Sequence, residues 1–199
     1  MNKNNFFSSL TLLGLFVFSS CNLDLAPEDT LSPKTYFKNG PQLELWTNHF
    51  YSLFPDVDDL AKQNADDNIS SELGETLMGQ RSAASENGWT WERLRDINYY
   101  LQHSNQCPDE HVRKQYDGVA YFFRAYFYFD KVKRYGDVPW YDQVLNSNDD
   151  KLLAKPRQDR EIIMDSVMQD LDKAIGMLPT KKDQVRVTKW TALALKSRV

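Results

Sequence analysis

Cysteine and long apolar segments are both scarce in this sequence. Only Cys21 and Cys107 are present among 199 residues, which excludes a framework of several disulfide bonds. Beyond residue 18, no apolar run approaches the roughly 20 residues that a membrane-spanning helix requires. The fold must therefore depend on a hydrophobic core, and a chain of this length with 13% aromatic residues has ample material for one.

Several motifs of catalysis and nucleotide binding are also missing. The sequence contains no Gly-x-Ser-x-Gly nucleophile elbow and no glycine-rich loop of the type that cradles phosphate. Acidic residues outnumber basic residues by 28 to 24, whereas binding to nucleic acid needs a basic face. We therefore expect no nucleic acid partner and no cofactor.

The N-terminal segment is typical of an export signal. Lys3 is the only charged residue before an apolar run from Phe6 to Phe18, which is interrupted by Ser8, Ser9 and Thr11. This run is too short to span a bilayer and directly follows a cationic flank, as in a cleaved signal peptide. Removal of the segment leaves 23 of the 24 basic residues and all 28 acidic ones, a net charge of −5.

The end of the apolar run predicts a lipid anchor. Phe18-Ser19-Ser20-Cys21 places two small residues before a cysteine and resembles the lipobox that the lipoprotein signal peptidase cleaves. We expect cleavage before Cys21 and acylation of this cysteine, including palmitate. The alternative is an ordinary secretory signal in which Cys21 is incidental, and in both cases the protein leaves the cytoplasm. With Cys21 acylated, Cys107 has no disulfide partner and is expected to be a free, partly buried thiol.

Five helices are expected from apolar residues that recur at spacings of three and four. The predicted ranges are 41–54, 91–105, 109–135 and 159–178, followed by a last helix that Thr188 is placed to cap. The third range is too aromatic on all sides for a surface helix, and Gly136 is placed to cap its C-terminus. Tyr36 and Phe37 are expected to dock the preceding proline-rich segment onto the helices.

The connections between these helices differ in character. Residues 56–88 are predicted to form a long structured loop, and loops of this length are uncommon unless they are functional. Residues 137–141 are expected to be extended and residues 146–150 to form a polar loop. No strand alternation is visible, so antiparallel helix pairs are the expected architecture. The last helix has no stop signal before Val199, so we expect the chain to be the N-terminal part of a longer protein.

The segment from Arg124 to Pro139 carries a family resemblance. It is an Arg-Ala-aromatic helix that ends in Tyr-Gly-Asp-Val-Pro, and it resembles the SusD/RagB family of outer-membrane nutrient-uptake lipoproteins of Bacteroidetes. Three further segments agree with this family: Leu23-Asp24-Leu25-Ala26-Pro27 after Cys21, the helix from Trp91 to Ile97-Asn98, and the helix from Asp159 to Pro179 followed by Arg186-Val187-Thr188-Lys189.

The resemblance implies an all-α, tetratricopeptide-like scaffold with long ligand-binding loops. The expected organisation is a lipoprotein signal peptide over residues 1–20, a lipidated tether over 21–40, and the N-terminal part of a SusD-like helical domain, truncated at its C-terminus, over 41–199. The resemblance also implies a partner, a SusC-type TonB-dependent outer-membrane transporter. The expected location is the outer membrane, where the protein is lipid-anchored and exposed on the surface. The aromatic run itself is interpreted as helix packing and not as a binding site.

The function implied by the resemblance is nutrient binding without catalysis. The expected ligand is an oligosaccharide or polysaccharide that the protein delivers to the transporter. A lipid-anchored glycoside hydrolase and a peptide- or protein-binding member of the same scaffold remain alternatives. The clusters of acidic residues in this sequence do not favour a hydrolase by themselves, because such clusters are more simply solvated loop charges.

Ligand contacts are expected in and beside the 56–91 region, where polar and aromatic residues lie on loops. The candidate residues are Asp66, Asp67, Asn68, Arg81, Asn87 and Trp89. An alternative is that Trp89 and Trp91 form a core pair that anchors the second helix. Trp91 fits the apolar stripe of that helix, so Trp89 is the tryptophan expected to be exposed.

A metal site is not expected. His103, Cys107 and His111 are spaced by four residues, which would place three ligands on one face of a continuous helix. Pro108 interrupts that helix, so the three side chains are not expected to converge.

Overall fold

The computed structural model describes residues 36–56, 78–80, 82 and 88–199. The chain divides into two units, Met1–Tyr36 and Phe37–Val199, and every helix of the described residues belongs to the second unit. These helices are α2 (Gly40–Asn48), α4 (Glu92–His103), α5 (Glu110–Tyr135), α6 (Asp150–Leu153), α7 (Arg160–Met177) and α8 (Lys189–Lys196), with 3-10 turns at η1 (His49–Leu53) and η2 (Ser104–Gln106).

Helices α2, α5, α7 and α8 begin at residues whose side chains cap them. The Asp109 carboxylate accepts a hydrogen bond from the Val112 main-chain N at 3.1 Å, and the Asp159 carboxylate accepts one from Glu161 N at 2.9 Å. Thr188 caps α8 in a reciprocal capping box with Thr191. Gly136, at a φ of 70°, ends α5 in a backbone conformation that favours glycine.

The predicted helices are confirmed, with two differences. The first range is α-helical only to Asn48 and continues as the tighter turn η1, and the second ends at His103 and continues as η2. Helix ends often tighten in this way, here shortly before Pro55 and Pro108. The polar loop predicted at 146–150 ends one residue early, because the short helix α6 begins at Asp150, and the single turn of α6 is too brief to show a periodic pattern.

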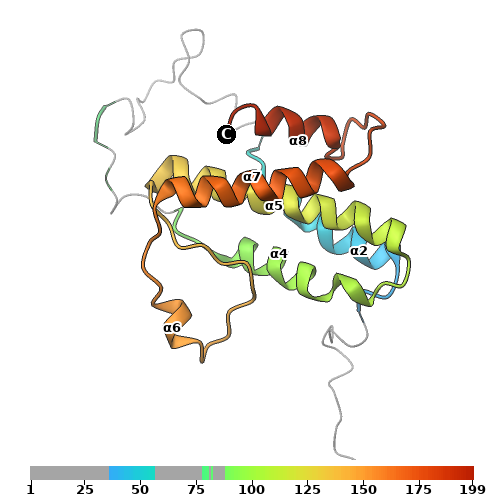
Figure 1. Cartoon of the computed structure of the whole chain (residues 1–199), viewed down its shortest axis with the longest axis horizontal. Helices are drawn as coiled ribbons and strands as arrows, with labels where there is room; N and C mark the ends of the chain where they lie inside the picture. Colours follow the sequence, from blue (N-terminus) through green and yellow to red (C-terminus); the bar gives the residue numbers. More distant parts are fainter. Residues whose placement is uncertain (1–35, 57–77, 81, 83–87) are drawn as a thin grey trace, which may run out of the picture. The chain divides into compact units, whose positions relative to one another are not determined.

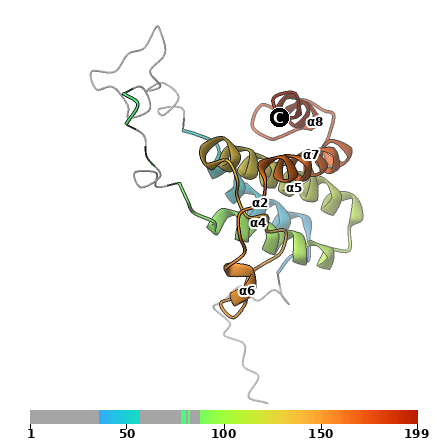
Figure 2. The same ribbon diagram turned by 60° about the vertical axis from the view of Figure 1, so that its left-hand side comes forward.

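Helix α5 is central among the packed helices of the second unit. Helices α2 and α4 pack on one side of α5, α7 packs on the other, and α8 packs against α7 (Figures 1 and 2). Successive long helices run antiparallel, as α4 to α5, α5 to α7 and α7 to α8 (Figure 1). In the part of the chain that the structure describes there is no strand, only one isolated antiparallel bridge between Val138 and Gln158.

The core is largely aromatic, as the composition indicates. Its fully buried side chains include Phe50, Tyr100, Phe123 and Tyr128 from η1, α4 and α5. Phe37 is also fully buried, and its ring lies 5.0 Å from that of Trp46, edge to face. The expected docking of the segment before α2 is thereby confirmed for Phe37, which holds a φ of 64° to reach this position.

Candidate functional site

A pocket of about 630 Å³ lies between α4 and the segment that connects α5 to α7. We name it the α4 pocket. Its lining combines an aromatic ring, two opposite charges, amides, a hydroxyl and leucines: Trp91, Glu92, Arg95, Asn98, Gln143, Leu145, Asn146, Ser147 and Leu153. Concave sites with a few convergent polar groups on a rigid scaffold are the usual sites for small ligands.

The α4 wall of the pocket follows from helical periodicity. Trp91, Arg95 and Asn98 are spaced by four and three residues, so they lie on one face of the helix. Leu94 and Ile97, on the adjacent face, are buried in the core and fix the orientation of α4. The pocket side chains are therefore presented by a helix that is anchored by its apolar face.

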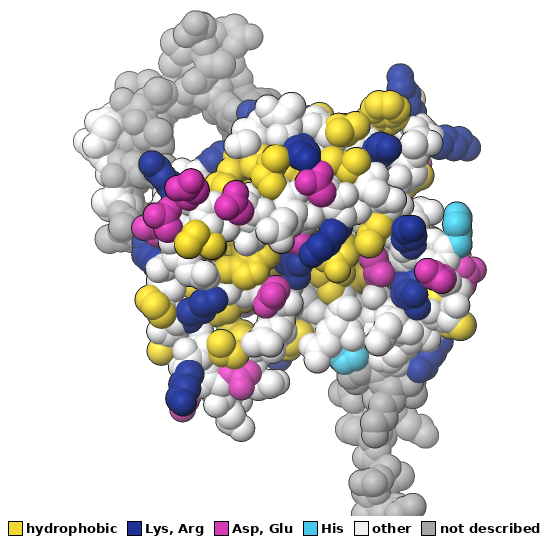
Figure 3. All heavy atoms as spheres, in the orientation of Figure 1, with side chains coloured by type: hydrophobic (Ala, Val, Ile, Leu, Met, Phe, Trp, Pro, Cys, Tyr) yellow, Lys and Arg dark blue, Asp and Glu magenta, His cyan; other side chains and the backbone are white. Residues whose placement is uncertain are grey.

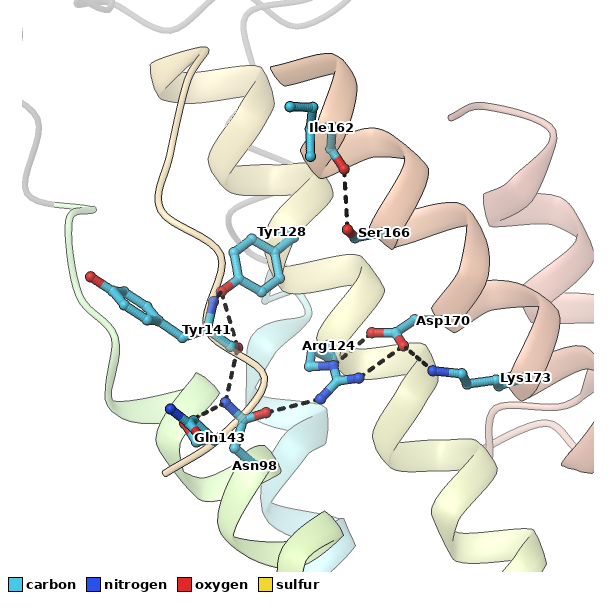
Figure 4. Close-up of polar contacts among 9 residues, drawn as sticks. All are labelled: Asn98, Arg124, Tyr128, Tyr141, Gln143, Ile162, Ser166, Asp170 and Lys173. Atoms are coloured by element: carbon cyan, nitrogen blue, oxygen red, sulfur yellow. Dashed lines mark hydrogen bonds and ion pairs between the residues drawn. The ribbon is translucent and has the colours of Figure 1, made fainter. Parts of the chain in front are cut away.

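A buried polar network holds the opposite wall against α4 (Figure 4). The Asn98 side-chain amide donates to the carbonyl oxygens of Tyr141, at 3.0 Å, and Gln143, at 3.2 Å. The Asn98 Oδ1 atom accepts a hydrogen bond from Arg124 Nη1 at 3.2 Å. Asn98 thus joins the connecting segment to α5, and its polar atoms are engaged in the structure and not open to a ligand.

Arg124 is fixed in turn by Asp170 of α7. Its Nε and Nη2 atoms donate to the two carboxylate oxygens of Asp170 at 2.6 and 2.9 Å. Both side chains are almost completely buried, and the hydrogen bond from Arg124 to the Asp170 carboxylate raises the pKa of the arginine against the opposing effect of burial. The network therefore links α4, α5, α7 and the pocket wall through one guanidinium group.

Trp91 forms the aromatic end of the pocket and is held by other rings. It packs edge to face on Tyr141, with ring centroids 5.5 Å apart, and lies near Phe127 and Tyr128 of α5. The Lys131 ammonium group lies 5.7 Å from the Trp91 ring centroid and donates a hydrogen bond to the Gly88 carbonyl oxygen. The end of the preceding connection is thus tied to α5.

Two charged groups of the pocket remain available to a ligand. Glu92 and Arg95 are exposed, and neither forms an ion pair or a side-chain hydrogen bond with another residue that the structure describes. Among the described residues that line the pocket, Glu92 is also the one that carries a carboxylate. The pocket therefore offers separate donor and acceptor groups beside an aromatic ring.

Of the sequence-predicted ligand residues, only Trp89 lies within the described part of the chain. Asp66, Asp67, Asn68, Arg81 and Asn87 lie outside the described residues. Trp89 is 38% exposed, as expected, and is more exposed than Trp91. It also packs edge to face on Trp91, with centroids 5.2 Å apart, so the two tryptophans form a pair at the start of α4. A ligand-binding role for Trp89 stays a prediction.

The α4 pocket itself is not predicted by the sequence. Asn98 belongs to a family motif, and Gln143 and Asn146 lie in or beside segments expected to be extended or polar. The spacing of Trp91, Arg95 and Asn98 is the available signal on the helix side. The connecting segment on the other side carries no periodic pattern, and its position depends on contacts with residues far away in the sequence.

Two of the three residues considered for a metal site, His103 and Cys107, have structural contacts, and His111 is exposed. His103 Nδ1 is hydrogen-bonded to the Tyr99 carbonyl oxygen at 2.8 Å, and its ring stacks on Phe37. Cys107 is a free, fully buried thiol. Within residues 36–56, 78–80, 82 and 88–199, no group of three or more His, Cys, Asp or Glu side chains is arranged to hold a metal ion.

One face of the molecule carries charges of both signs (Figure 3). On the face shown in Figure 3, basic and acidic side chains are interspersed, with hydrophobic side chains visible between them. No helix among the described residues is long and apolar enough to cross a membrane.

Comparisons with known proteins agree with one another. Residues 44–199 match the model of a SusD-like family described as starch-binding and associating with the outer membrane. A curated SusD-like protein of Formosa agariphila is 26% identical over 99% of this chain, and the chain spans 42% of the length of that relative.

Solved structures of SusD-like proteins resemble the fold. One from Bacteroides fragilis superposes with a TM-score of 0.72 and 27% identity, covering 87% of this chain and 37% of that one. A laminarin-binding SusD-like protein superposes with a TM-score of 0.62 and 19% identity, covering 81% of this chain and 40% of that one.

Proposed function

This chain belongs to the SusD-like family, and from that premise we propose that it is a non-catalytic surface lipoprotein that binds a glycan. The glycan is an oligosaccharide or polysaccharide nutrient, and the protein delivers it to a TonB-dependent outer-membrane transporter of the SusC type. The family itself is described as starch-binding and associating with the outer membrane. The chain spans less than half the length of its curated relative, so the activity of the whole protein is part of this proposal.

The main observation in support of this proposal is the chemistry of the α4 pocket. Sugar rings present an apolar face and a rim of hydroxyl groups. In the pocket, the Trp91 ring can stack on the apolar face of a sugar. The Glu92 carboxylate and the Arg95 guanidinium group can form hydrogen bonds with its hydroxyl groups. Trp89, which precedes the helix and is partly exposed, extends the aromatic surface beside the pocket.

The acidic groups of the α4 pocket fit binding better than hydrolysis. A glycoside hydrolase typically uses two carboxyl groups that flank the scissile bond about 5 to 10 Å apart. The lining of the α4 pocket includes Glu92 and no second carboxylate among the described residues. We infer binding and release of the glycan without cleavage.

The membrane location is supported by sequence and family together. The lipobox-like segment before Cys21 predicts an acyl anchor, and the family is described as associating with the outer membrane. An acylated domain outside the cytoplasm fits a protein that captures large glycans for a transporter. The SusC-type partner is part of the proposal.

Isothermal titration calorimetry of the full-length protein against a panel of glycans and peptides tests the proposal. We expect binding of at least one glycan, and a weakening of roughly tenfold for Glu92→Gln or Arg95→Gln, since a hydrogen bond to a charged group contributes about 1.5–3 kcal/mol. Glu161→Gln, an exposed change on α7, is the matched control and should leave the affinity unchanged.

Two results would contradict the proposal. Release of shortened sugars from the bound glycan, detected by chromatography, would identify a hydrolase. Binding of peptides with no binding of glycans would identify a peptide receptor on the same scaffold.

A further inference from the structure

Arg157 and Trp89 form a cation–aromatic pair beside the α4 pocket. The guanidinium carbon of Arg157 lies 4.7 Å from the centroid of the Trp89 ring. Both side chains are exposed, Trp89 by 38%. Trp89 lies three positions before the start of α4, and Arg157 lies in the segment that leads into α7. It is therefore a surface feature next to the proposed glycan site.

The ring of this pair is fixed in orientation. Trp89 packs edge to face on Trp91, at 5.2 Å and 82°, and on Tyr135 of α5, at 4.8 Å and 88°. The Gly88 carbonyl oxygen, adjacent in sequence, accepts a hydrogen bond from Lys131. The indole is thus a rigid platform for the arginine.

The backbone that carries Arg157 is also fixed. Gln158 N donates to the Val138 carbonyl oxygen at 3.1 Å, and Gln158 Oε1 accepts from Trp140 N at 3.1 Å. On the other side, Lys155 Nζ donates to the Trp140 carbonyl oxygen at 3.0 Å. Arg157 consequently lies between two anchored residues, so little backbone entropy remains to be lost when it binds a ligand.

Arg157 differs from two other stacked arginines in having no acidic partner. Arg124 lies over Tyr121 and is paired with Asp170, and Arg186 lies over Tyr51 and is paired with Glu44. Arg157 forms no ion pair and no side-chain hydrogen bond with any residue in the described part of the chain. Its N–H donors, which lie in the guanidinium plane, are left for a ligand.

We propose that the Trp89–Arg157 pair binds the carboxylate of an acidic sugar, so that the glycan ligand contains uronic acid residues. A guanidinium group matches a carboxylate with two parallel N–H···O bonds, and stacking on an aromatic ring leaves those donors free. This inference rests on the proposed glycan-binding function and specifies the class of glycan. The subsite for the carboxylate lies next to the α4 pocket. In the pocket, the hydroxyl groups of adjoining sugars contact Glu92 and Arg95.

The test compares two ligands that share one sugar backbone, one with ionised carboxylates and one with neutral methyl esters. Oligogalacturonate and its fully methyl-esterified form are titrated into the full-length protein, together with neutral starch and laminarin fragments. We expect the acid form to bind at least roughly tenfold more tightly than the ester at low salt, with the difference shrinking as salt is added. Arg157→Gln should remove the preference for the acid and leave binding of the ester unchanged. Arg160→Gln, an exposed arginine three residues away, should retain the preference.

The possible results distinguish failure of the acidic-sugar subsite from failure of glycan binding as a whole. Equal affinity for acid and ester, or a preference that survives Arg157→Gln, would overturn the inference while glycan binding stands. Binding of neutral starch or laminarin fragments without binding of oligogalacturonate would do the same. Failure to bind any glycan would overturn both. Circular dichroism of Arg157→Gln confirms that the variant is folded.

Discussion

The Arg124–Asp170 ion pair connects α5 to α7 through buried, charge-assisted hydrogen bonds. Replacing one member of a buried pair leaves an uncompensated charge, at a cost of about 3–5 kcal/mol. We therefore expect Asp170→Asn to lower the free energy of unfolding by this amount, because Arg124 keeps its charge in a buried site. Urea denaturation followed by circular dichroism measures the difference.

The control for this prediction is another ion pair of α7. Asp172 pairs with Lys196 of α8 on the surface, and exposed pairs contribute about 0–1 kcal/mol. Asp172→Asn should therefore cost far less than Asp170→Asn. The double variant Arg124→Met with Asp170→Leu should recover much of the loss, since it removes both buried charges. Equal costs for the two single variants would refute a special role for the buried pair.

Asp117 of α5 is the carboxyl group with the clearest consequence for pH dependence. Burial raises its pKa above the ordinary carboxyl value, and its Oδ1 atom is buried without a hydrogen-bond partner in the structure. The pKa of the Asp117 carboxyl group is thus higher in the folded chain than in the unfolded chain. The contribution of this group to stability is therefore fully present below the unfolded-state pKa and is lost as the pH rises through the folded-state pKa. Raising the pH above the unfolded-state pKa of this carboxyl group therefore lowers the stability of the fold.

Asp117→Asn removes this titration. We expect the variant to gain stability relative to the wild type as pH is raised to neutrality from about 3.9, the ordinary pKa of an aspartate carboxyl in the unfolded chain. Urea denaturation of both proteins across this range gives the difference at each pH. A difference that does not change with pH would show that Asp117 does not titrate as its burial indicates.

At the level of helices, most of the fold could be predicted from the sequence. The long helices carry apolar residues at helical spacing, and recognisable capping residues mark their boundaries. Helix α5 begins after Asp109 and ends before Gly136, and α7 begins after Asp159. Helix α6 was missed because one turn carries too little pattern. The 3-10 turns after α2 and α4 depend on how the chain leaves each helix, and local sequence does not fix that exit.

Two glycines of α5 and α7, Gly118 and Gly176, differ in the space available for a side chain. A Cβ atom on Gly118 would lie 2.9 Å from Met177 Cβ and 3.2 Å from the main-chain N of Leu178, where the backbone cannot easily yield. A Cβ atom on Gly176 would contact nothing within 4 Å. Gly118 is therefore the position at which the two helices approach closely.

We expect opposite effects of alanine at these positions. Gly118→Ala should destabilise the protein by about 1–3 kcal/mol through overpacking. Gly176→Ala should stabilise it by about 0.5–1 kcal/mol, since alanine is favoured over glycine inside a helix. Thermal denaturation of both variants gives the sign directly. Stabilisation by Gly118→Ala would mean that α5 and α7 are less closely packed than described.

At the level of the whole molecule, the family was predictable and the pocket was not. The segment from Arg124 to Pro139, which carries the family resemblance, includes the part of α5 that lies between α4 and α7. One wall of the α4 pocket is held in place by hydrogen bonds that join Asn98 to Arg124 and to Tyr141. Arg124 and Tyr141 are separated from Asn98 by 26 and 43 positions, and no local pattern in the sequence indicates their contact.

The attachment of the whole protein to the membrane is predicted to depend on one of its two cysteines. In the native bacterium, Cys21→Ser should abolish incorporation of a fatty acid label and move the protein from the membrane fraction to the soluble extracytoplasmic fraction. The physical reason is that the acyl chains supply the affinity for the bilayer, at about 0.8 kcal/mol per buried methylene group. Fractionation and labelling with an alkyne-tagged fatty acid measure both effects.

Cys107→Ala is the matched control, because Cys107 is a buried free thiol in the core and not in the lipobox-like segment. This variant should keep the fatty acid label and stay with the membrane, at a modest loss of stability. Label retained in Cys21→Ser and lost in Cys107→Ala would overturn the assignment of the anchor. A protein that is exported, unlabelled in both forms and soluble would instead have an ordinary secretory signal, and its capture of glycans at the outer membrane would then require the transporter alone to retain it.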